Sequence, residues 1–202
     1  MLAQVALGPP DSEELPSDVG RLIQRSSRRI HAALADLGQR ACGFVPCDYE
    51  DLYRALVAIG EVYIDKSRFC EWGSGFGVGC VLASLTGSEA CGIEIRSEYV
   101  RAARDLATEL GLDIEFYEGS FVPSDYDPSA HLHCADGVTI LSGSGANDEV
   151  DVAIDDFDLI YAFPWPGEED LYFDIFDRYA ACGAHLLTYH GPAEGFALQR
   201  KI

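Results

Sequence analysis

The chain has 202 residues, of which 48% are hydrophobic and 24% charged, a composition that excludes an intrinsically disordered protein. Its 14 basic residues stand against 34 acidic ones, and the formal charge of −20 disfavours binding to nucleic acid or to an anionic membrane. No apolar run approaches the roughly 20 residues of a membrane span, and the N-terminus does not resemble a secretory signal. Seven scattered cysteines indicate reduced thiols and a cytoplasmic protein.

Residues 1–40 are predicted to form a tail and one helix. Two prolines and an acidic patch make residues 1–16 typical of a loose tail. A helix is then expected from Ser17 or Asp18 to Leu37, because it begins with a capping residue and is followed by a glycine. The arginines on its polar side (Arg25, Arg28, Arg29) are either solvated or paired with acidic residues of the same chain.

From residue 41 onward, expected strands and helices alternate. The strands are predicted at 68–72, 90–95, 114–117, 158–163, 185–189 and 196–199. The helices are predicted at 48–59, 78–85, 97–110 and 168–181. This alternation predicts a three-layer α/β fold with a mostly parallel sheet and helices on both faces. Residues 41–202 are expected to form one domain, with an acidic, irregular insertion at about 123–157.

A glycine-rich turn joins the first of these strands to its helix, with Glu71, Gly73, Gly75 and Gly77 at alternate positions. Glycine lets the backbone turn sharply and lets a ligand approach main-chain N–H groups. The dinucleotide fingerprint needs glycine at position 78, where this chain has valine, so a nicotinamide-dependent oxidoreductase is disfavoured. A carboxylate at position 71 would repel a pyrophosphate and suits a ligand with an amino group.

Two later strand ends strengthen this interpretation. Glu94 lies 21 residues after Gly73, about where an acidic residue binds ribose hydroxyls. Ser120 and Phe121 follow the third strand, where a polar group and an apolar wall could hold an adenine ring.

In these segments the chain resembles the class I S-adenosylmethionine-dependent methyltransferases, over about residues 41–200 and most strongly over 69–121. The resemblance implies a Rossmann-like methyltransferase fold with a shortened C-terminal end, and S-adenosyl-L-methionine as the cofactor. The segment Phe44–Tyr49 resembles one that lies over the cofactor in small members of the family. The residues implied to bind the cofactor are Tyr49, Glu71, Gly73, Gly75, Gly77, Glu94, Ile95, Ser120, Phe121 and Phe163.

The resemblance places the substrate side after the fourth strand, at Tyr161–Glu169. Phe163 stands where members that methylate exocyclic base amines have Asn or Asp, which disfavours that reaction. Trp165 either stacks on a substrate or cation or packs at the sheet edge, and Glu168 and Glu169 either take up charge or stabilise a helix N-terminus. The candidate catalytic residues are Trp165, Glu168 and Tyr161, with His190 as a further candidate base by location.

No metal site is expected, because His131, His133 and Cys134 have no partner pair elsewhere in the chain. Residues 111–180 contain one basic and 17 acidic side chains. This concentration on the substrate side indicates a cationic acceptor such as an amine, or a basic protein partner, unless the carboxylates only keep the segment soluble. The sequence thus predicts a methyltransferase with a small-molecule or protein acceptor. The alternative is a non-catalytic, regulatory protein that binds the same cofactor.

Overall fold

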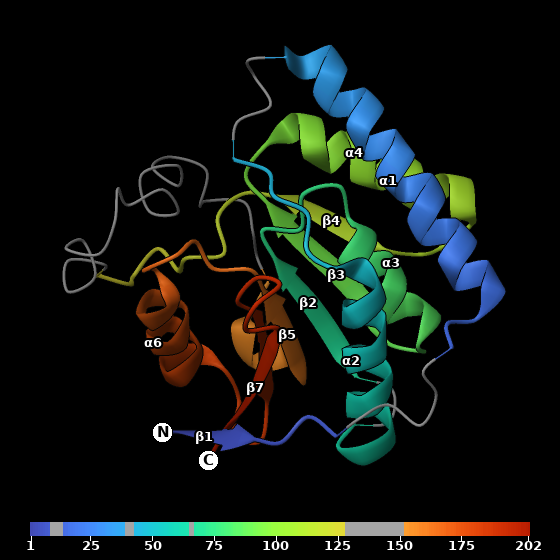
Figure 1. Ribbon diagram of the computed structural model, residues 1–202. Helices are drawn as coiled ribbons and strands as arrows, with labels where there is room; N and C mark the ends of the chain where they lie inside the picture. The colour runs from blue at the N-terminus through green and yellow to red at the C-terminus, as the bar shows by residue number, and fades with distance from the viewer. Residues whose placement is uncertain (9–13, 39–42, 65–66, 128–151) are drawn as a thin grey trace.

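The sheet at the centre of the molecule has seven strands in the order β1-β7-β6-β5-β2-β3-β4 (Figure 1). The computed structural model describes residues 1–8, 14–38, 43–64, 67–127 and 152–202. The strands are β1 (Leu2–Val5), β2 (Arg68–Trp72), β3 (Glu89–Glu94), β4 (Glu115–Glu118), β5 (Leu159–Ala162), β6 (His185–Tyr189) and β7 (Phe196–Lys201). The helices are α1 (Ser17–Leu37), α2 (Tyr49–Val62), α3 (Val78–Leu85), α4 (Ser97–Leu110), the short 3-10 helix η3 (Ile154–Asp156) and α6 (Glu169–Tyr179).

Every element predicted from residue 17 onward is present, with boundaries within three residues of the prediction. Local chemistry accounts for this agreement. The carboxylate of Asp48 accepts hydrogen bonds from the N–H groups of Glu50 and Asp51 at the start of α2. At the end of α4, Gly111 adopts a φ of 66°, which favours glycine over other residues.

The sheet is mixed, which corrects the expectation of a mostly parallel one. The pairs β3–β4, β2–β3, β2–β5 and β5–β6 are parallel, whereas β6–β7 and β1–β7 are antiparallel. The chain reverses after β6 through a short turn, closed by hydrogen bonds from His190 N–H to the Gly195 carbonyl and from Gly195 N–H to the Gly191 carbonyl. A turn of this kind joins antiparallel strands, whereas parallel neighbours require a crossover. The antiparallel pairing predicted for residues 196–199 is confirmed.

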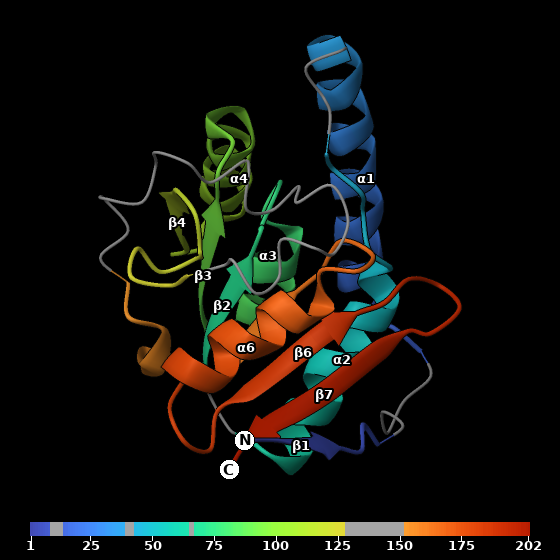
Figure 2. The ribbon, with the colours of Figure 1, turned by 90° about the vertical axis from the view of Figure 1, so that its left-hand side faces the viewer.

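The prediction of a loose tail over residues 1–16 is wrong at its beginning. Leu2–Val5 forms the edge strand β1, in which Leu2 pairs with Lys201 and Val5 with Leu198 (Figure 2). The main-chain N–H of Ile202 also donates to the carbonyl of Met1 at 3.0 Å. The partner strand is distant in the sequence, so no local pattern predicts this pairing.

Helices cover both faces of the sheet, as predicted. Alternation along β2 divides the core, because successive side chains of a strand point to opposite faces. Phe69 packs with apolar residues of α2 and α3, whereas Cys70 and Trp72 pack with α6 on the other face. The first face is covered by α1, α2, α3 and α4, and the second by α6 (Figure 2).

Of the arginines predicted on α1, Arg25 and Arg29 both form ion pairs with Glu109 of α4, so the pairing alternative is confirmed for these two. The cysteines within the described ranges (Cys47, Cys70, Cys80, Cys91 and Cys182) are all free thiols. None of the helices that the structure describes is long and apolar enough to cross a membrane. Most of the predicted acidic insertion, with His131, His133 and Cys134, lies outside the described residues.

Candidate functional site

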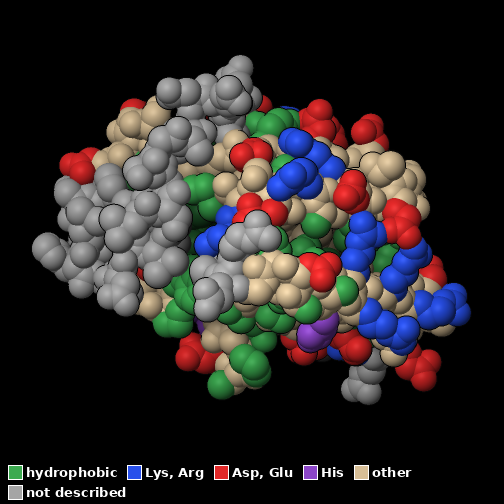
Figure 3. All heavy atoms as spheres, turned by 90° about the horizontal axis from the view of Figure 1, so that it is seen from above, with side chains coloured by type: hydrophobic (Ala, Val, Ile, Leu, Met, Phe, Trp, Pro, Cys, Tyr) green, Lys and Arg blue, Asp and Glu red, His purple; other side chains and the backbone are tan. Residues whose placement is uncertain are grey.

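A cavity of about 530 Å³ opens at the edge of the sheet where the parallel strands end. Its lining comes from the turn after β2 and from the segments that follow β3, β4, β5 and β6. In the sheet, β2 lies between β3 and β5, and the strand order reverses at this point. The cavity therefore lies at the switch point where open α/β sheets bind ligands. Figure 3 views the molecule from this side and shows hydrophobic side chains bordered by basic and acidic ones.

The glycine-rich turn after β2 has the backbone that its sequence predicts. Gly73, Gly75 and Gly77 have φ values of 74°, 52° and 74°, a region that other residues rarely adopt. The N–H groups of Gly73 and Ser74 donate to the carbonyl of Ile93, and the N–H of Gly77 donates to the carbonyl of Ser74. The turn is therefore held against β3 by main-chain hydrogen bonds.

Glu94, at the end of β3, completes the attachment of the turn. Its carboxylate accepts the N–H of Gly75 at 2.9 Å through Oε2 and the N–H of Arg96 at 2.8 Å through Oε1. The side chain is buried yet lines the cavity. Burial raises the pKa of Glu94, and its main-chain hydrogen bonds oppose that rise. A carboxylate has about four lone-pair positions, so Glu94 can still accept a hydrogen bond from a ligand hydroxyl.

Glu71 points away from the cavity and lies beneath the start of α3. Its Oε2 accepts hydrogen bonds from the N–H of Cys80 at 3.0 Å and from the Cys80 thiol at 3.2 Å. Burial raises the pKa of Glu71 to about 8, and the hydrogen bonds from Cys80 offset part of this effect. Tyr49 and Tyr161 interact electrostatically with Glu71, and burial raises the pKa of both phenols. The carboxyl group therefore belongs to a buried polar cluster behind the glycine turn.

The predicted site residues divide into two groups. Those that line the cavity are Gly73, Glu94, Ile95, Ser120, Phe121, Phe163 and Trp165, together with the candidate base His190. Those that do not line it are Tyr49, Glu71, Gly75, Gly77, Tyr161 and Glu168. Gly75 still contacts the site through its hydrogen bond to Glu94, and Gly77 is the N-cap of α3.

Trp72 is the main lining residue that the sequence reasoning missed. Its ring stacks on Phe121, with centroids 4.8 Å apart and planes 7° apart, and Phe121 also contacts Tyr172 of α6. The Trp72 indole N–H is buried and has no hydrogen-bond partner among the described residues. The position of Trp72 directly before the glycine turn, at the carboxyl end of β2, was the signal that could have revealed it. Arg96, Tyr99 and Glu194 were likewise missed.

The side of the cavity beyond the ends of β5 and β6 carries aromatic, acidic and imidazole groups. Trp165 is half-buried there, and Glu169 and Glu194 also line it. His190 Nε2 lies 2.8 Å from the Thr188 hydroxyl, which fixes the orientation of the ring. Glu168 is the buried N-cap residue of α6 and does not reach the lining, in agreement with its alternative role at a helix N-terminus. Within the described ranges, no group of three or more side chains is arranged to hold a metal ion.

No protein-family profile and no curated protein sequence matches the chain. Solved structures do match. An RNA methyltransferase from Salinibacter ruber in complex with S-adenosyl-L-homocysteine is 17% identical, with a TM-score of 0.55, over 78% of this chain and 94% of that one. A ribosomal protein L11 methylase from Lactobacillus delbrueckii subsp. bulgaricus is 17% identical, with a TM-score of 0.50, over 75% of this chain and 78% of that one.

Three further solved structures, with TM-scores under 0.5, are matched over only 38–51% of their own length. Because all these identities are low, the likeness concerns architecture. It shows that the chain has the fold of the class I S-adenosylmethionine-dependent methyltransferases.

Proposed function

We propose that the protein binds S-adenosylmethionine in the cavity at the ends of β2, β3 and β4 and transfers its methyl group to an acceptor held beyond the ends of β5 and β6. The observation that carries this proposal is Glu94, a buried carboxylate that lines the cavity and is anchored to the glycine turn at the switch point of the sheet. The methyltransferase fold also supports the proposal that the protein binds S-adenosylmethionine.

The residues of the cavity fit this cofactor. A volume of about 530 Å³ lies within the range of small-molecule sites. The Glu94 carboxylate suits ribose hydroxyls, while Ile95 and Phe121 offer apolar walls for a base. The buried indole N–H of Trp72 supplies a donor without a partner among the described residues. The bound cofactor supplies a methyl group on a sulfonium, which is a good leaving group.

A dinucleotide fits the same turn poorly. The N–H groups of Gly73, Ser74, Gly75 and Gly77 all donate within the chain, so they offer no cradle for a pyrophosphate. The carboxylate of Glu94 also sits against the turn and would repel the phosphates. These two features argue against a nicotinamide-dependent oxidoreductase. Glu71 does not contribute to this argument, because its side chain points away from the cavity.

For the acceptor, aromatic and acidic groups favour an amine. Trp165 can stack on a cationic or planar group, and the carboxylates of Glu169 and Glu194 attract positive charge. Methyl transfer needs the two reactants in line, and this positioning supplies most of the catalysis. An amine must lose a proton to react, and His190 is the candidate base that lines the cavity. When its Nε2–H donates to Thr188, Nδ1 is left as the proton acceptor.

Calorimetric titration tests the cofactor. S-adenosylmethionine and S-adenosylhomocysteine are expected to bind and NAD is not. Glu94→Ala should weaken binding by at least about tenfold, as expected when a charge-assisted hydrogen bond is lost. Glu118→Ala is the matched control, because it removes an exposed carboxylate at the end of the neighbouring strand. Binding of NAD alone, or equal affinities in the two variants, would contradict the proposal.

A transfer assay with methyl-labelled cofactor tests the acceptor. Amines and basic peptides are expected to accept methyl groups, and rising ionic strength should lower the rate. Glu169→Gln or Glu194→Gln should raise KM for such an acceptor several-fold, whereas Asp170→Asn, next to Glu169 but outside the lining, should not. Methylation of RNA or of an anionic acceptor would overturn the amine assignment. Cofactor binding without transfer to any acceptor would indicate the non-catalytic alternative.

A further inference from the structure

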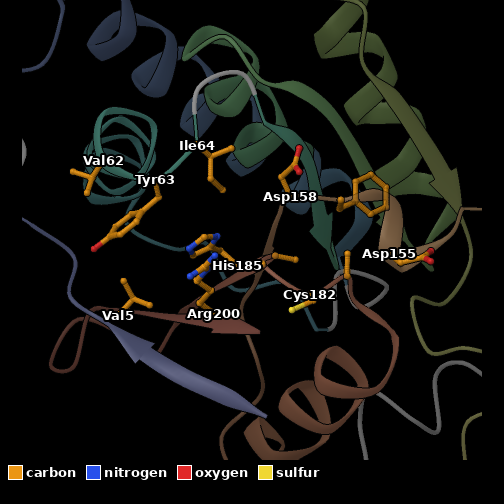
Figure 4. A pocket seen from close by; sticks show the side chains of 13 residues that line it. Val5, Val62, Tyr63, Ile64, Asp155, Asp158, Cys182, His185 and Arg200 are labelled. Carbon is orange, nitrogen blue, oxygen red and sulfur yellow. The ribbon is translucent and has the colours of Figure 1, made fainter. Parts of the chain in front are cut away.

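A second cavity lies at the opposite end of the sheet, where β5 and β6 begin. Its volume is about 640 Å³, within the range of small-molecule sites. Its lining includes Val5 of β1 and Tyr63 and Ile64 at the end of α2; in Figure 4, Val5 and Tyr63 lie on one side of His185, and Asp158 lies on the other. No residue of this cavity belongs to the cofactor site.

His185 is the residue that singles out this cavity. Its side chain is 4% exposed, and neither imidazole nitrogen has a hydrogen-bond partner among the described residues. Buried polar groups are almost always hydrogen-bonded. A buried imidazole that has no partner and faces a cavity therefore indicates that a ligand binds there. In Figure 4 the ring lies between α2 and β7 and faces the space that the other lining side chains enclose.

Arg200 places a positive charge directly beside this imidazole. His185 and Arg200 are opposite each other in the antiparallel pair β6–β7, so their side chains share one face of the sheet. Arg200 is exposed, and its guanidinium has no hydrogen-bond partner within the part of the chain that the structure describes. Burial, and then Arg200, lower the pKa of His185, so the ring is neutral near pH 7 and has one N–H donor and one acceptor.

Two carboxylates, Asp155 and Asp158, also line the cavity. Asp158 accepts the main-chain N–H of Arg68 at 2.9 Å and offsets only part of the effect of Arg200 on His185. Asp155 lies at the far rim of the cavity in Figure 4. The guanidinium and the imidazole N–H are thus the donors that an anionic group would meet.

The remaining walls are apolar and aromatic. The Tyr63 ring lies 5.5 Å from the His185 ring between centroids, and its hydroxyl donates to the carbonyl of Ala6 at 2.9 Å, which fixes its position. Val5 and Ile64 complete this side. A ligand here needs a compact body that packs against these side chains and a head that accepts hydrogen bonds.

We propose that this cavity is a second binding site, which takes a small molecule carrying a carboxylate or phosphate group on a compact aromatic or apolar body. The anionic group binds Arg200, whose planar guanidinium suits both head groups, and accepts the N–H of His185. The body packs against Tyr63, Val5 and Ile64. The site is separate from the proposed methyl-transfer site and does not depend on that function.

Nuclear magnetic resonance on protein labelled at its five histidines tests this proposal. Benzoate and phenyl phosphate are the two probes, with benzyl alcohol as the neutral analogue, and a His185→Gln variant assigns the signal. At least one anionic probe is expected to shift the His185 imidazole signals saturably, leaving His190 of the other cavity and His31 of α1 unchanged. Which probe binds more tightly distinguishes a carboxylate from a phosphate ligand.

Arg200→Gln should weaken probe binding by about tenfold or more. Arg200→Lys keeps the charge but loses the planar guanidinium, so its affinity for the probe should lie between those of the parent and Arg200→Gln. Arg21→Gln is the control, because it removes the same charge from an exposed position on α1. The absence of any saturable shift at His185 would overturn the proposal. So would equal binding of benzyl alcohol, or equal affinity in Arg200→Gln, Arg200→Lys and Arg21→Gln.

Discussion

The carboxylate of Glu94 accepts the main-chain N–H of Gly75 across 2.9 Å, and this contact joins the end of β3 to the middle of the glycine turn. The second carboxylate oxygen accepts the N–H of Arg96, directly before α4. One side chain thus holds the turn after β2 and the start of the next helix in a fixed relation. A residue predicted to bind a ligand is therefore also part of the framework of the site.

Glu94→Ala is expected to lower the free energy of unfolding by about 1–3 kcal/mol, because two main-chain donors lose a buried acceptor. Amide hydrogen exchange at Gly75 and Arg96 should quicken more than exchange in the core strands. Glu118→Ala, at an exposed position, should change stability by no more than about 0.5 kcal/mol. Unchanged exchange at Gly75 would show that Glu94 does not hold the turn.

Glu71 makes stability depend on pH. Its folded-state pKa of about 8 lies above the ordinary value of 4.5, because burial disfavours the charged form. Between these two pH values the folded state keeps a proton that the unfolded state has lost, so stability falls as pH rises, by at most about 1.4 kcal/mol per pH unit. Above about pH 8 this contribution is constant.

Glu71→Gln is expected to remove this slope, since the amide oxygen can still accept the Cys80 N–H and has no proton to lose. Urea unfolding of the parent and the variant at several pH values checks it. The variant should gain stability over the parent as pH rises from 5 toward 8. A constant difference across that range would mean that Glu71 titrates normally.

The two tryptophans of the chain, Trp72 and Trp165, both line the cavity at the strand ends. Intrinsic fluorescence should therefore report occupancy of this cavity without a label. S-adenosylhomocysteine is expected to change the emission saturably in the parent and in Trp165→Phe, which keeps only Trp72. Calorimetric binding with no change in emission would place the ligand elsewhere.

Gly73 and Gly77 share a φ of 74° but differ in their surroundings. A Cβ on Gly77 would lie 2.6 Å from the Phe116 ring and 2.8 Å from Ala103, whereas a Cβ on Gly73 meets nothing within 4 Å. Gly73→Ala should therefore cost about 1–2 kcal/mol from the strained backbone alone. Gly77→Ala should cost a further 1–3 kcal/mol or so, because it also overpacks the core. Equal losses in urea unfolding would contradict this distinction.

Sequence reasoning found the elements from residue 17 onward because their ends carry local signals, such as Asp48 before α2 and Gly111 after α4. It also placed Glu94, Ser120, Phe121 and Phe163 in one cavity, because the carboxyl ends of parallel strands meet at the same edge. β1 escaped prediction because its partner, β7, is distant in the sequence.

Two of the predicted residues that do not line the cavity share a physical reason. Glu71 and Tyr161 are opposite each other in the pair β2–β5, so both point to the same face of the sheet, beneath the helices rather than toward the strand ends. The period-2 alternation of a strand decides this orientation, and it equally sends Trp72 to the face covered by α6. A motif fixes the positions of residues along the chain, whereas the pleat decides which side chains face a ligand.

The pairing of β1 with β7 has a consequence for how the molecule is assembled. During synthesis, Leu2–Val5 emerges long before its hydrogen-bonding partner at Phe196–Lys201. The intervening strands and helices can form in order, whereas this outer strand must wait until β7 has been made. Because Val5 of β1 and Arg200 of β7 both border the second cavity, that cavity is complete only when these two strands have paired.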